Sequence, residues 1–318
     1  MQNKKKLISV AIPCFEEEEN ILPMYQTLIQ IIKKDKKYDY EFVFADNGST
    51  DKTKDLIIQL TLKDKKVKGV FLSRNFGPEA STQAAFDFSR GDAVVGIACD
   101  FQEPPGLIPQ FIKKWEEGYE MVIGVHSKIQ DNVLMTITRK IFYKIFKKIS
   151  NIDIPINASG FCLFDRKPLK ALQALPEKYR FFRGLRAWIG FKTAYINYER
   201  RYRLRGRSSY SFFNYINHAE RGIFGFSYLV LDLMIYGGFI LVIFSFIFVA
   251  WYLFMVLVIG NPIRASIPLM LTIVFFGGVQ LLSVSIIGKY IQVIVEETKA
   301  RPIYIVTETQ NIEPAPKG

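Results

Sequence analysis

The chain has 318 residues, a formal net charge of +12 and a hydrophobic content of 49%. Its three cysteines, Cys14, Cys99 and Cys162, stand far apart, which excludes a disulfide framework and the paired cysteines of a zinc site. The two histidines, His126 and His218, share no metal-ligand spacing, and no RNA-binding signature favours nucleic acid as a partner.

The amino-terminal part alternates short apolar runs with amphipathic stretches. We expect strands at 7–12, 41–45, 67–72, 93–98 and 121–125, and helices at 20–34, after 51, at 78–89 and at 107–118. Such alternation is typical of an α/β domain with a mostly parallel sheet. Because ligands bind beyond the carboxyl ends of such strands, segments 13–17, 46–51 and 100–105 should converge on one pocket.

Two of these segments carry groups suited to a nucleotide and a metal. Asp100 follows an expected strand, and Gln102 lies two residues further on. Carboxylate and amide oxygens suit Mg²⁺ or Mn²⁺, which leave room for substrate phosphates. The segment 46–51 offers acceptors and hydroxyls that can read a base and a ribose. Taken alone, each segment could equally be an ordinary turn or a helix N-cap.

The carboxyl-terminal part is predicted to meet a membrane. Amphipathic stretches at 134–149 and 212–226 lie either in the headgroup plane or against a core. Two charge-free stretches, 233–263 and 265–288, are separated only by Arg264. Each exceeds the roughly 20 apolar residues that a transmembrane helix needs.

Basic residues flank the pair of spans and predict its orientation. Arg221 precedes the first span, and Lys289, Lys299 and Arg301 follow the second. The positive-inside rule places the head and both termini in the cytoplasm of a multi-pass inner-membrane protein. We expect a cytoplasmic catalytic domain at 1–210, a juxtamembrane amphipathic helix at 211–231, two transmembrane helices within 232–295 and a cytoplasmic tail at 296–318. The tail after Tyr304 is expected to be mobile.

An ordered set of motifs connects these pieces. In chain order they are Val10-Ala11-Ile12-Pro13-Cys14-Phe15-Glu16-Glu17, Asp46-Asn47-Gly48-Ser49-Thr50-Asp51, Leu72-Ser73-Arg74-Asn75-Phe76-Gly77, Asp100-Phe101-Gln102-Glu103-Pro104-Pro105, Arg180-Phe181-Phe182-Arg183-Gly184-Leu185, Tyr198-Glu199-Arg200 with Arg203, and Gly206-Arg207-Ser208-Ser209-Tyr210. The set resembles family 2 glycosyltransferases of the GT-A fold over nearly the whole chain. Within them it resembles the polyprenyl-phosphate branch, which includes dolichol-phosphate mannose synthase and bacterial undecaprenyl-phosphate glycosyltransferases.

The resemblance implies an activity and a set of site residues. The implied reaction is an inverting transfer of one sugar from a UDP- or GDP-sugar to undecaprenyl or dolichyl phosphate, with Mg²⁺ or Mn²⁺ as cofactor. By resemblance, Pro13, Glu16, Asp46 and Asn47 contact the nucleotide, Asp100 and Gln102 hold the metal, Asp100, Arg183 and Arg200 act in catalysis, and Arg203 and Ser208 meet the acceptor phosphate. Arginine forks match phosphate oxygens through two-point contacts, which agrees with these roles.

The chain departs from the family pattern inside the expected pocket. Ala98 stands where the family usually has Asp, Asn47 where a second Asp is common, Gly160 and Cys162 where many bacterial members read Asp and Arg, and Ser209 where Lys is usual. The departures leave open whether donor choice is altered or activity is lost.

Two other functions therefore remain as alternatives. One is a diverged, non-catalytic membrane homologue that acts as an adaptor. The other is a processive polysaccharide synthase, although residues 183–188 only approximate its Gln-x-x-Arg-Trp motif and two spans are few for a polymer channel. The sequence does not choose the sugar, the nucleotide or the lipid length, and it leaves open whether the chain forms a homo-oligomer.

Overall fold

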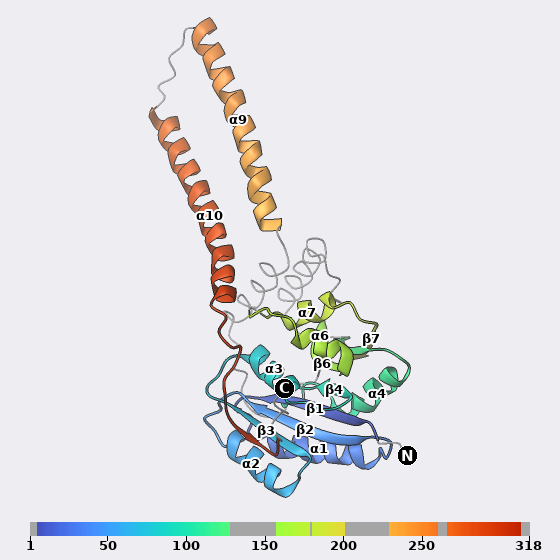
Figure 1. Cartoon of the computed structure of the whole chain (residues 1–318). Helices are drawn as coiled ribbons and strands as arrows, with labels where there is room; N and C mark the ends of the chain where they lie inside the picture. The colour runs from blue at the N-terminus through green and yellow to red at the C-terminus, as the bar shows by residue number, and fades with distance from the viewer. Residues whose placement is uncertain (1–4, 128–156, 179, 201–228, 260–265, 313–318) are drawn as a thin grey trace.

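The computed structural model describes residues 5–127, 157–178, 180–200, 229–259 and 266–312. One sheet has the strand order β7-β5-β6-β4-β1-β2-β3-β8 (Figure 1). The strands are β1 (Leu7–Cys14), β2 (Asp39–Asp46), β3 (Val67–Leu72), β4 (Ala93–Gly96), β5 (Met121–His126), β6 (Ala158–Asp165), β7 (Thr193–Tyr198) and β8 (Val306–Gln310). The helices are α1 (Ile21–Lys33), α2 (Thr53–Lys63), α3 (Pro78–Asp87), η1 (Pro105–Leu107), α4 (Ile108–Glu116), α6 (Arg166–Gln173), α7 (Phe182–Trp188), α9 (Leu229–Ile259) and α10 (Ser266–Thr298).

Four parallel strands, β4, β1, β2 and β3, form the middle of the sheet. Their side chains are buried on both faces. In β1, for example, Ile8, Val10 and Ile12 enter one core cluster, while Ala11 enters the other. Strands covered on both sides read as continuous apolar runs, which is why the sequence predicts them well. The α/β class and the five strands expected in the amino-terminal part are confirmed.

Helices cover both faces of the sheet (Figure 1). On one face, α1, α2 and α4 bury Met24, Ile57 and Phe111 against the strands. On the other face, α3, α6 and α7 bury Phe86, Leu172 and other apolar side chains. This three-layer arrangement leaves the carboxyl ends of the parallel strands uncovered, and we call this side of the domain, where those strands end, the open edge.

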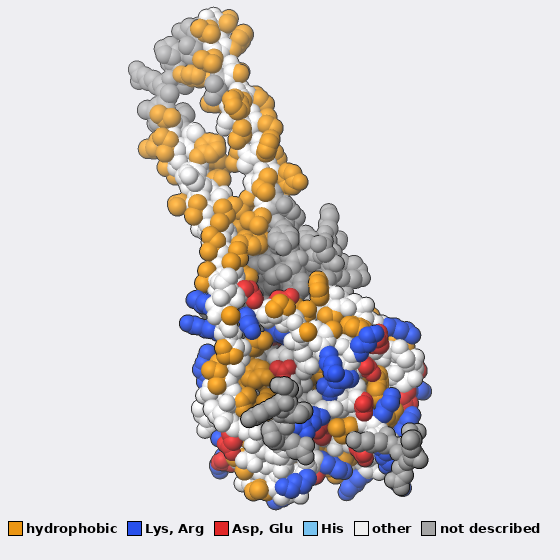
Figure 2. All heavy atoms as spheres, in the orientation of Figure 1, with side chains coloured by type: hydrophobic (Ala, Val, Ile, Leu, Met, Phe, Trp, Pro, Cys, Tyr) orange, Lys and Arg blue, Asp and Glu red, His pale blue; other side chains and the backbone are white. Residues whose placement is uncertain are grey.

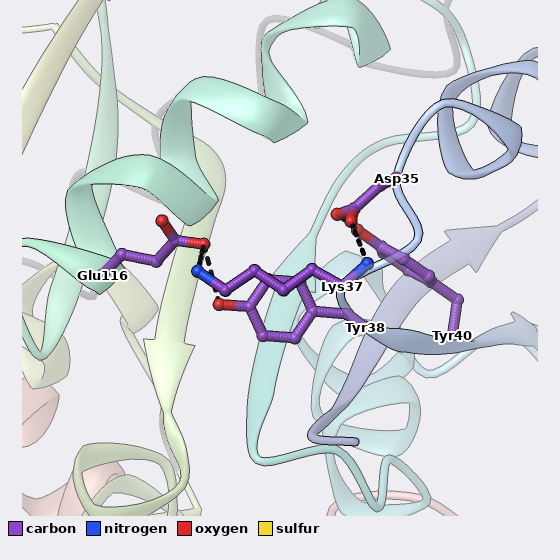
Figure 3. A network of polar contacts seen from close by, with 5 residues as sticks. All are labelled: Asp35, Lys37, Tyr38, Tyr40 and Glu116. Carbon is purple, nitrogen blue, oxygen red and sulfur yellow. Dashed lines mark hydrogen bonds and ion pairs between the residues drawn. The ribbon is translucent and has the colours of Figure 1, made fainter.

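At the opposite end of the strands, polar contacts join the turn after α1 to helix α4 (Figure 3), beside a cavity of about 510 Å³. Lys37 Nζ and the Tyr38 hydroxyl both donate to Oε1 of Glu116, at 2.9 and 2.7 Å. The Tyr40 hydroxyl donates to Oδ2 of Asp35 at 2.5 Å. Because these groups hold one another, we regard this end as structural.

The remaining strands make the sheet mixed. β6 pairs antiparallel with both β4 and β5, whereas β7 pairs parallel with β5. The sequence does not predict β6 and β7, because each follows a segment without clear strand and helix alternation. Together they extend the sheet beyond β4 and carry Gly160, Cys162 and Tyr198 to the open edge.

The prediction that the tail after Tyr304 is mobile is wrong for the part of the tail that the structure describes. Val306–Gln310 pairs antiparallel with β3 as the last strand of the sheet. The Tyr304 hydroxyl donates to Oδ2 of Asp87 at 2.7 Å, and Asn311 Nδ2 donates to the carbonyl of Thr61 at 2.6 Å. The physical reason is that β3 would otherwise be an edge strand with unpaired backbone groups, and β8 supplies partners for them. The local sequence of the tail does not indicate this pairing.

Two long apolar helices project from the head and contact each other (Figure 1). Within α9 and α10, the segments Leu233–Met255 and Thr272–Thr298 are long and apolar enough to cross a membrane. Large apolar side chains are exposed along the described parts of both helices (Figure 2), with Phe246 73% and Leu257 82% exposed. Such a surface suits a lipid solvent, since exposed apolar patches of this size are rare in water. The predicted amphipathic stretches at 134–149 and 212–226, and Arg264, lie outside the described residues.

Candidate active site

The carboxyl ends of β4, β1 and β2 lie side by side at the open edge. β1 and β2 pair in parallel up to Cys14 opposite Asp46, and the amide of Asn47 donates to the carbonyl of Cys14 at 2.9 Å. Beyond β4, the amide of Ile97 donates to the carbonyl of Ala11 at 3.1 Å. The segments after these three strands therefore share one edge, as the sequence predicts.

Asp46 and Glu16 form the part of this edge after β1 and β2. Asp46 is only 1% exposed, and its Oδ1 accepts the Ser49 hydroxyl at 2.5 Å. Burial raises the pKa of Asp46, and the Ser49 hydrogen bonds oppose that rise. The amide of Glu16 donates to the Ser49 hydroxyl at 2.9 Å, and the Thr50 hydroxyl donates to Oε1 of Glu16 at 3.1 Å. Pro13 lies half-buried at the end of β1 beside this cluster.

Asn47 lies beside Asp46 but faces the loop after β3. Its Nδ2 donates to Oδ1 of Asn75 at 3.0 Å and to the carbonyl of Gly77 at 3.1 Å. Its Oδ1 accepts the amide of Phe76 at 3.0 Å. An aspartate could accept but not donate, so the amide at this position is what holds residues 75–77 against the open edge.

The segment after β4 brings Asp100 and Gln102 to Arg200. Oδ1 of Asp100 accepts the amide of Gln102 at 3.1 Å, and Phe101 between them has a φ of 60°. Arg200, shortly after β7, donates from Nη2 to Oε1 of Gln102. The structure thus unites three residues that the sequence predicts for the site, two from one loop and one from a distant strand end.

Glu103 is a buried carboxyl that sequence reasoning missed. It is 8% exposed, and its Oε2 accepts the amide of Ala98 at 2.9 Å. Burial raises its pKa to about 7, while hydrogen bonds from the Ala98 and Phe161 amides oppose the rise. A Cβ atom at Gly160 would lie 3.5 Å from Oε1 of Glu103. The carboxyl of Glu103 therefore stands beside the position where many bacterial relatives read aspartate.

Three arginines around α7 have different surroundings. Arg183 is partly buried, whereas Arg180 and Arg186 are each 3% exposed. Burial lowers the pKa of Arg186, an effect that its attraction to Cys162 opposes. The Arg186 side chain contacts the Cys162 thiol on β6, at the position where the family pattern has arginine. Arg186 thus brings a guanidinium close to position 162, where the chain has cysteine in place of the arginine of the family pattern.

A signal for Arg186 exists in the sequence. Phe182, Leu185 and Arg186 are spaced as i, i+3 and i+4, so they share the apolar face of α7. A charged residue on such a face marks a buried ion. Glu103 gives no comparable signal, because its burial depends on contacts with Ala98 and β6.

The other predicted site residues cannot be placed. Arg203 and Ser208, predicted to meet the acceptor phosphate, and Ser209 lie outside the described residues.

The groups at the end of β4 fit a divalent ion only together with a substrate. In the described part of the chain, no group of three or more His, Cys, Asp and Glu side chains could hold a metal. Asp100 supplies one carboxylate, Gln102 supplies an amide oxygen that also accepts from Arg200, and Ala98 supplies no ligand atom. Mg²⁺ in nucleotide sites is commonly bound by one or two carboxylates plus substrate phosphates. The donor set therefore suits an ion that arrives with a diphosphate.

Comparison with known proteins identifies the family. Residues 9–173 match the family described as Glycosyl transferase family 2. An uncharacterized glycosyltransferase of Synechocystis is 35% identical over 310 residues, covering 97% of each chain. The bactoprenol glucosyl transferase of Shigella phage SfX is 36% identical over 300 residues, covering 94% of this chain and 98% of the relative.

A third relative and one solved structure complete the comparison. The prophage bactoprenol glucosyl transferase homolog of Escherichia coli K12 is 35% identical, covering 94% of this chain and 98% of its own. Glucosyl-3-phosphoglycerate synthase from Mycobacterium tuberculosis, solved with Mn²⁺ and UDP, is 21% identical, with a TM-score of 0.43 over 64% of this chain and 73% of its own. From the family match and the nearly full-length relatives, the chain belongs to glycosyl transferase family 2 and is a glycosyltransferase.

Proposed function

We propose that the chain transfers one sugar from a nucleotide-sugar to a polyprenyl phosphate, with inversion at the anomeric carbon. The observation that carries the proposal is the meeting of Asp100, Gln102 and Arg200 at the strand ends that also present Asp46. The acceptor is suggested by the names of the relatives, which act on bactoprenol and align over nearly the full length of this chain.

The donor nucleotide would lie across the ends of β1 and β2. Asp46 is a buried acceptor, and the neighbouring Ser49, Thr50 and Glu16 already form a hydrogen-bonded rim around it. Acceptors and hydroxyls of this kind suit a base and a ribose. Pro13 would pack against the nucleotide, while Asn47 would act through the loop at 75–77 that it holds.

The chemistry asks for little proton transfer by the protein. A phosphate monoester is anionic near neutral pH, so it can attack the anomeric carbon without a strong general base. The site acts by aligning the acceptor phosphate with the anomeric carbon and by stabilising the leaving diphosphate. A divalent ion, Mg²⁺ or Mn²⁺, held by Asp100 and Gln102 would neutralise charge on that diphosphate. Arg200 lies next to Gln102 to share that charge, and Arg183 would act with it.

The membrane would supply the acceptor. Two helices long and apolar enough to span a bilayer lie towards the carboxyl-terminal end of the chain. Basic residues that flank them favour a cytoplasmic head, cytoplasmic termini and an inner-membrane location. A polyprenyl phosphate would then present its phosphate at the same surface as the open edge of the sheet.

The test is a transfer assay with the full chain in detergent. Undecaprenyl phosphate is incubated with Mn²⁺ or Mg²⁺ and a panel of UDP- and GDP-sugars, and the lipid product is identified by mass spectrometry. A single-sugar phospholipid supports the proposal and names the donor. Nucleotide-sugar binding without product from any donor contradicts it in favour of the non-catalytic homologue, and a polymeric product contradicts it in favour of the synthase.

A further inference from the structure

A cavity of about 310 Å³ lies between α7 and the strands β5 and β7. Much of its wall is apolar, with Met121 and Ile123 from β5 and Phe191 from the segment after α7. Its cationic groups are Arg183 and Arg186, one helical turn apart on α7. The cavity combines apolar side chains with two guanidinium groups on one wall, and polar atoms make up at least as much of its surface as apolar atoms do.

Arg186 is the anomalous group in this cavity. Its side chain is 3% exposed, and Nη2 has no hydrogen-bond partner. The Cys162 thiol, its contact on β6, is a weak acceptor. Glu79 and Glu103 attract the guanidinium. Arginine keeps its charge, so burying a guanidinium with one unpaired nitrogen costs free energy.

Arg180 shows what the same stretch of chain does with a structural arginine. It is equally buried, yet Nη1 donates to Oε1 of Gln83 at 2.7 Å and Nη2 donates to the carbonyl of Leu175 at 2.6 Å. Its Nε also donates to the carbonyl of Glu177 at 3.1 Å. Six residues further along, Arg186 lines the cavity, and its buried Nη2 has no acceptor. The difference indicates that Arg186 serves to bind a ligand that carries hydrogen-bond acceptors.

We infer that the cavity under α7 is a phosphate-binding subsite, with Arg186 at its floor and Arg183 beside it. A guanidinium fork matches two phosphate oxygens, and two forks match the charge of a monoester dianion. The apolar side chains of Met121, Ile123 and Phe191 in the wall suit the hydrocarbon next to a lipid phosphate. The subsite therefore takes the phosphate of the acceptor, an assignment that rests on the proposed function.

The experiment measures binding by the full chain in detergent, without turnover. The probes are farnesyl phosphate, farnesol, inorganic phosphate and UDP, each titrated against the wild type and Arg186→Met. We expect Arg186→Met to weaken farnesyl phosphate binding by about 10- to 100-fold, as expected for loss of a charge-assisted hydrogen bond, and to leave farnesol and UDP unchanged. Inorganic phosphate should weaken in parallel, because it shares the phosphate chemistry without the chain.

Two further variants separate the local role of Arg186 from net charge and from folding. Lys170→Met on α6 removes one exposed positive charge outside the cavity and should leave farnesyl phosphate binding unchanged. The double variant Arg186→Met with Cys162→Arg returns a guanidinium from the contacting position on β6 and should recover part of the affinity. If Arg186→Met does not fold, Arg186→Lys, which keeps the charge but loses the fork, should still weaken farnesyl phosphate binding.

Each contrary result has a distinct meaning. Unchanged farnesyl phosphate binding in the folded Arg186 variants overturns the subsite. Weaker UDP binding with unchanged farnesyl phosphate binding overturns the acceptor assignment, because the phosphate bound would then belong to the donor. A wild type that binds farnesyl phosphate through Arg186 but transfers no sugar refutes the proposed function alone. A wild type that transfers sugar while Arg186→Met binds normally refutes the subsite alone.

Discussion

The guanidinium of Arg200 donates from Nη2 to Oε1 of Gln102. This contact ties the segment after β7, the outermost strand, to the segment after β4, which lies in the middle of the sheet. It places a permanent cation next to the residues proposed to bind the metal. The positive charge at this edge is therefore built into the fold before any ion or substrate binds.

Replacing Arg200 by Met should slow sugar transfer by about 10²- to 10³-fold, as for loss of a donor that stabilises developing charge. Arg200→Lys keeps a point charge but loses the planar fork, so its rate should fall between those of the wild type and Arg200→Met. The measurement is the transfer rate at saturating donor and acceptor. Lys170→Met serves as the matched loss of a surface charge, and equal rates for the wild type and Arg200→Met would show that the contact is structural only.

Replacing Asp100 by Asn should weaken the response of the transfer rate to Mn²⁺. Outer-shell partners of a metal already contribute about 10- to 100-fold in affinity or activity, so loss of the one carboxylate at this site should cost at least as much. The rate is measured against Mn²⁺ concentration after chelation with EDTA. Asp55→Asn, an exposed change on α2, is the control. A response of Asp100→Asn to Mn²⁺ identical to that of the wild type would remove Asp100 from the metal site.

Replacing Asn47 by Asp should destabilise the head, although aspartate is common there in the family. The carboxylate cannot donate to Asn75 or to the carbonyl of Gly77, so the head would lose the two hydrogen bonds that the buried Asn47 amide donates. We expect a loss of about 1–3 kcal/mol, measured as a lower unfolding temperature. Asn197→Asp makes the same chemical change at an exposed position of β7. Equal unfolding temperatures for the two variants would show that the hydrogen bonds donated by Asn47 do not stabilise the head.

Ending the chain at Pro302 should destabilise the catalytic domain. The deletion exposes the edge of β3 and removes Tyr304 and Val306 from the core cluster that includes α3 and α6. Ending the chain after Ile312 keeps β8 and is the matched control. Both truncations are compared by thermal unfolding in detergent, and an equal unfolding temperature would show that β8 contributes nothing to stability.

The Cys162 thiol should resist alkylation in the folded protein. Burial raises its pKa to about 12, with opposition from Arg186, so the reactive thiolate is scarce at pH 8. Peptide mass spectrometry after iodoacetamide treatment should find Cys162 unmodified at pH 8 and modified once the chain is unfolded. Rapid labelling of the folded protein would show that this face of β6 opens to solvent.

The local sequence pattern alone was sufficient to predict much of the fold of this protein. The apolar runs of β1 to β5 are buried on both faces, so their hydrophobic period reveals them directly. The carboxyl ends of parallel strands meet at one edge, which is why Asp46, Asp100 and Gln102 could be predicted as neighbours from motif order. The long apolar helices α9 and α10 follow from composition in the same way.

What the sequence determined by itself was the α/β class, the open edge with its acidic and amide groups, and the two apolar helices. The tertiary structure alone decided that β8 closes the sheet, that Asn47 holds the loop after β3, that Glu103 lies buried beside Gly160, and that Arg186 contacts Cys162. The reason is the range of the forces. Hydrophobic period and turn chemistry act between neighbours in the chain, whereas strand-edge pairing and the burial of a charge depend on groups that meet only after folding.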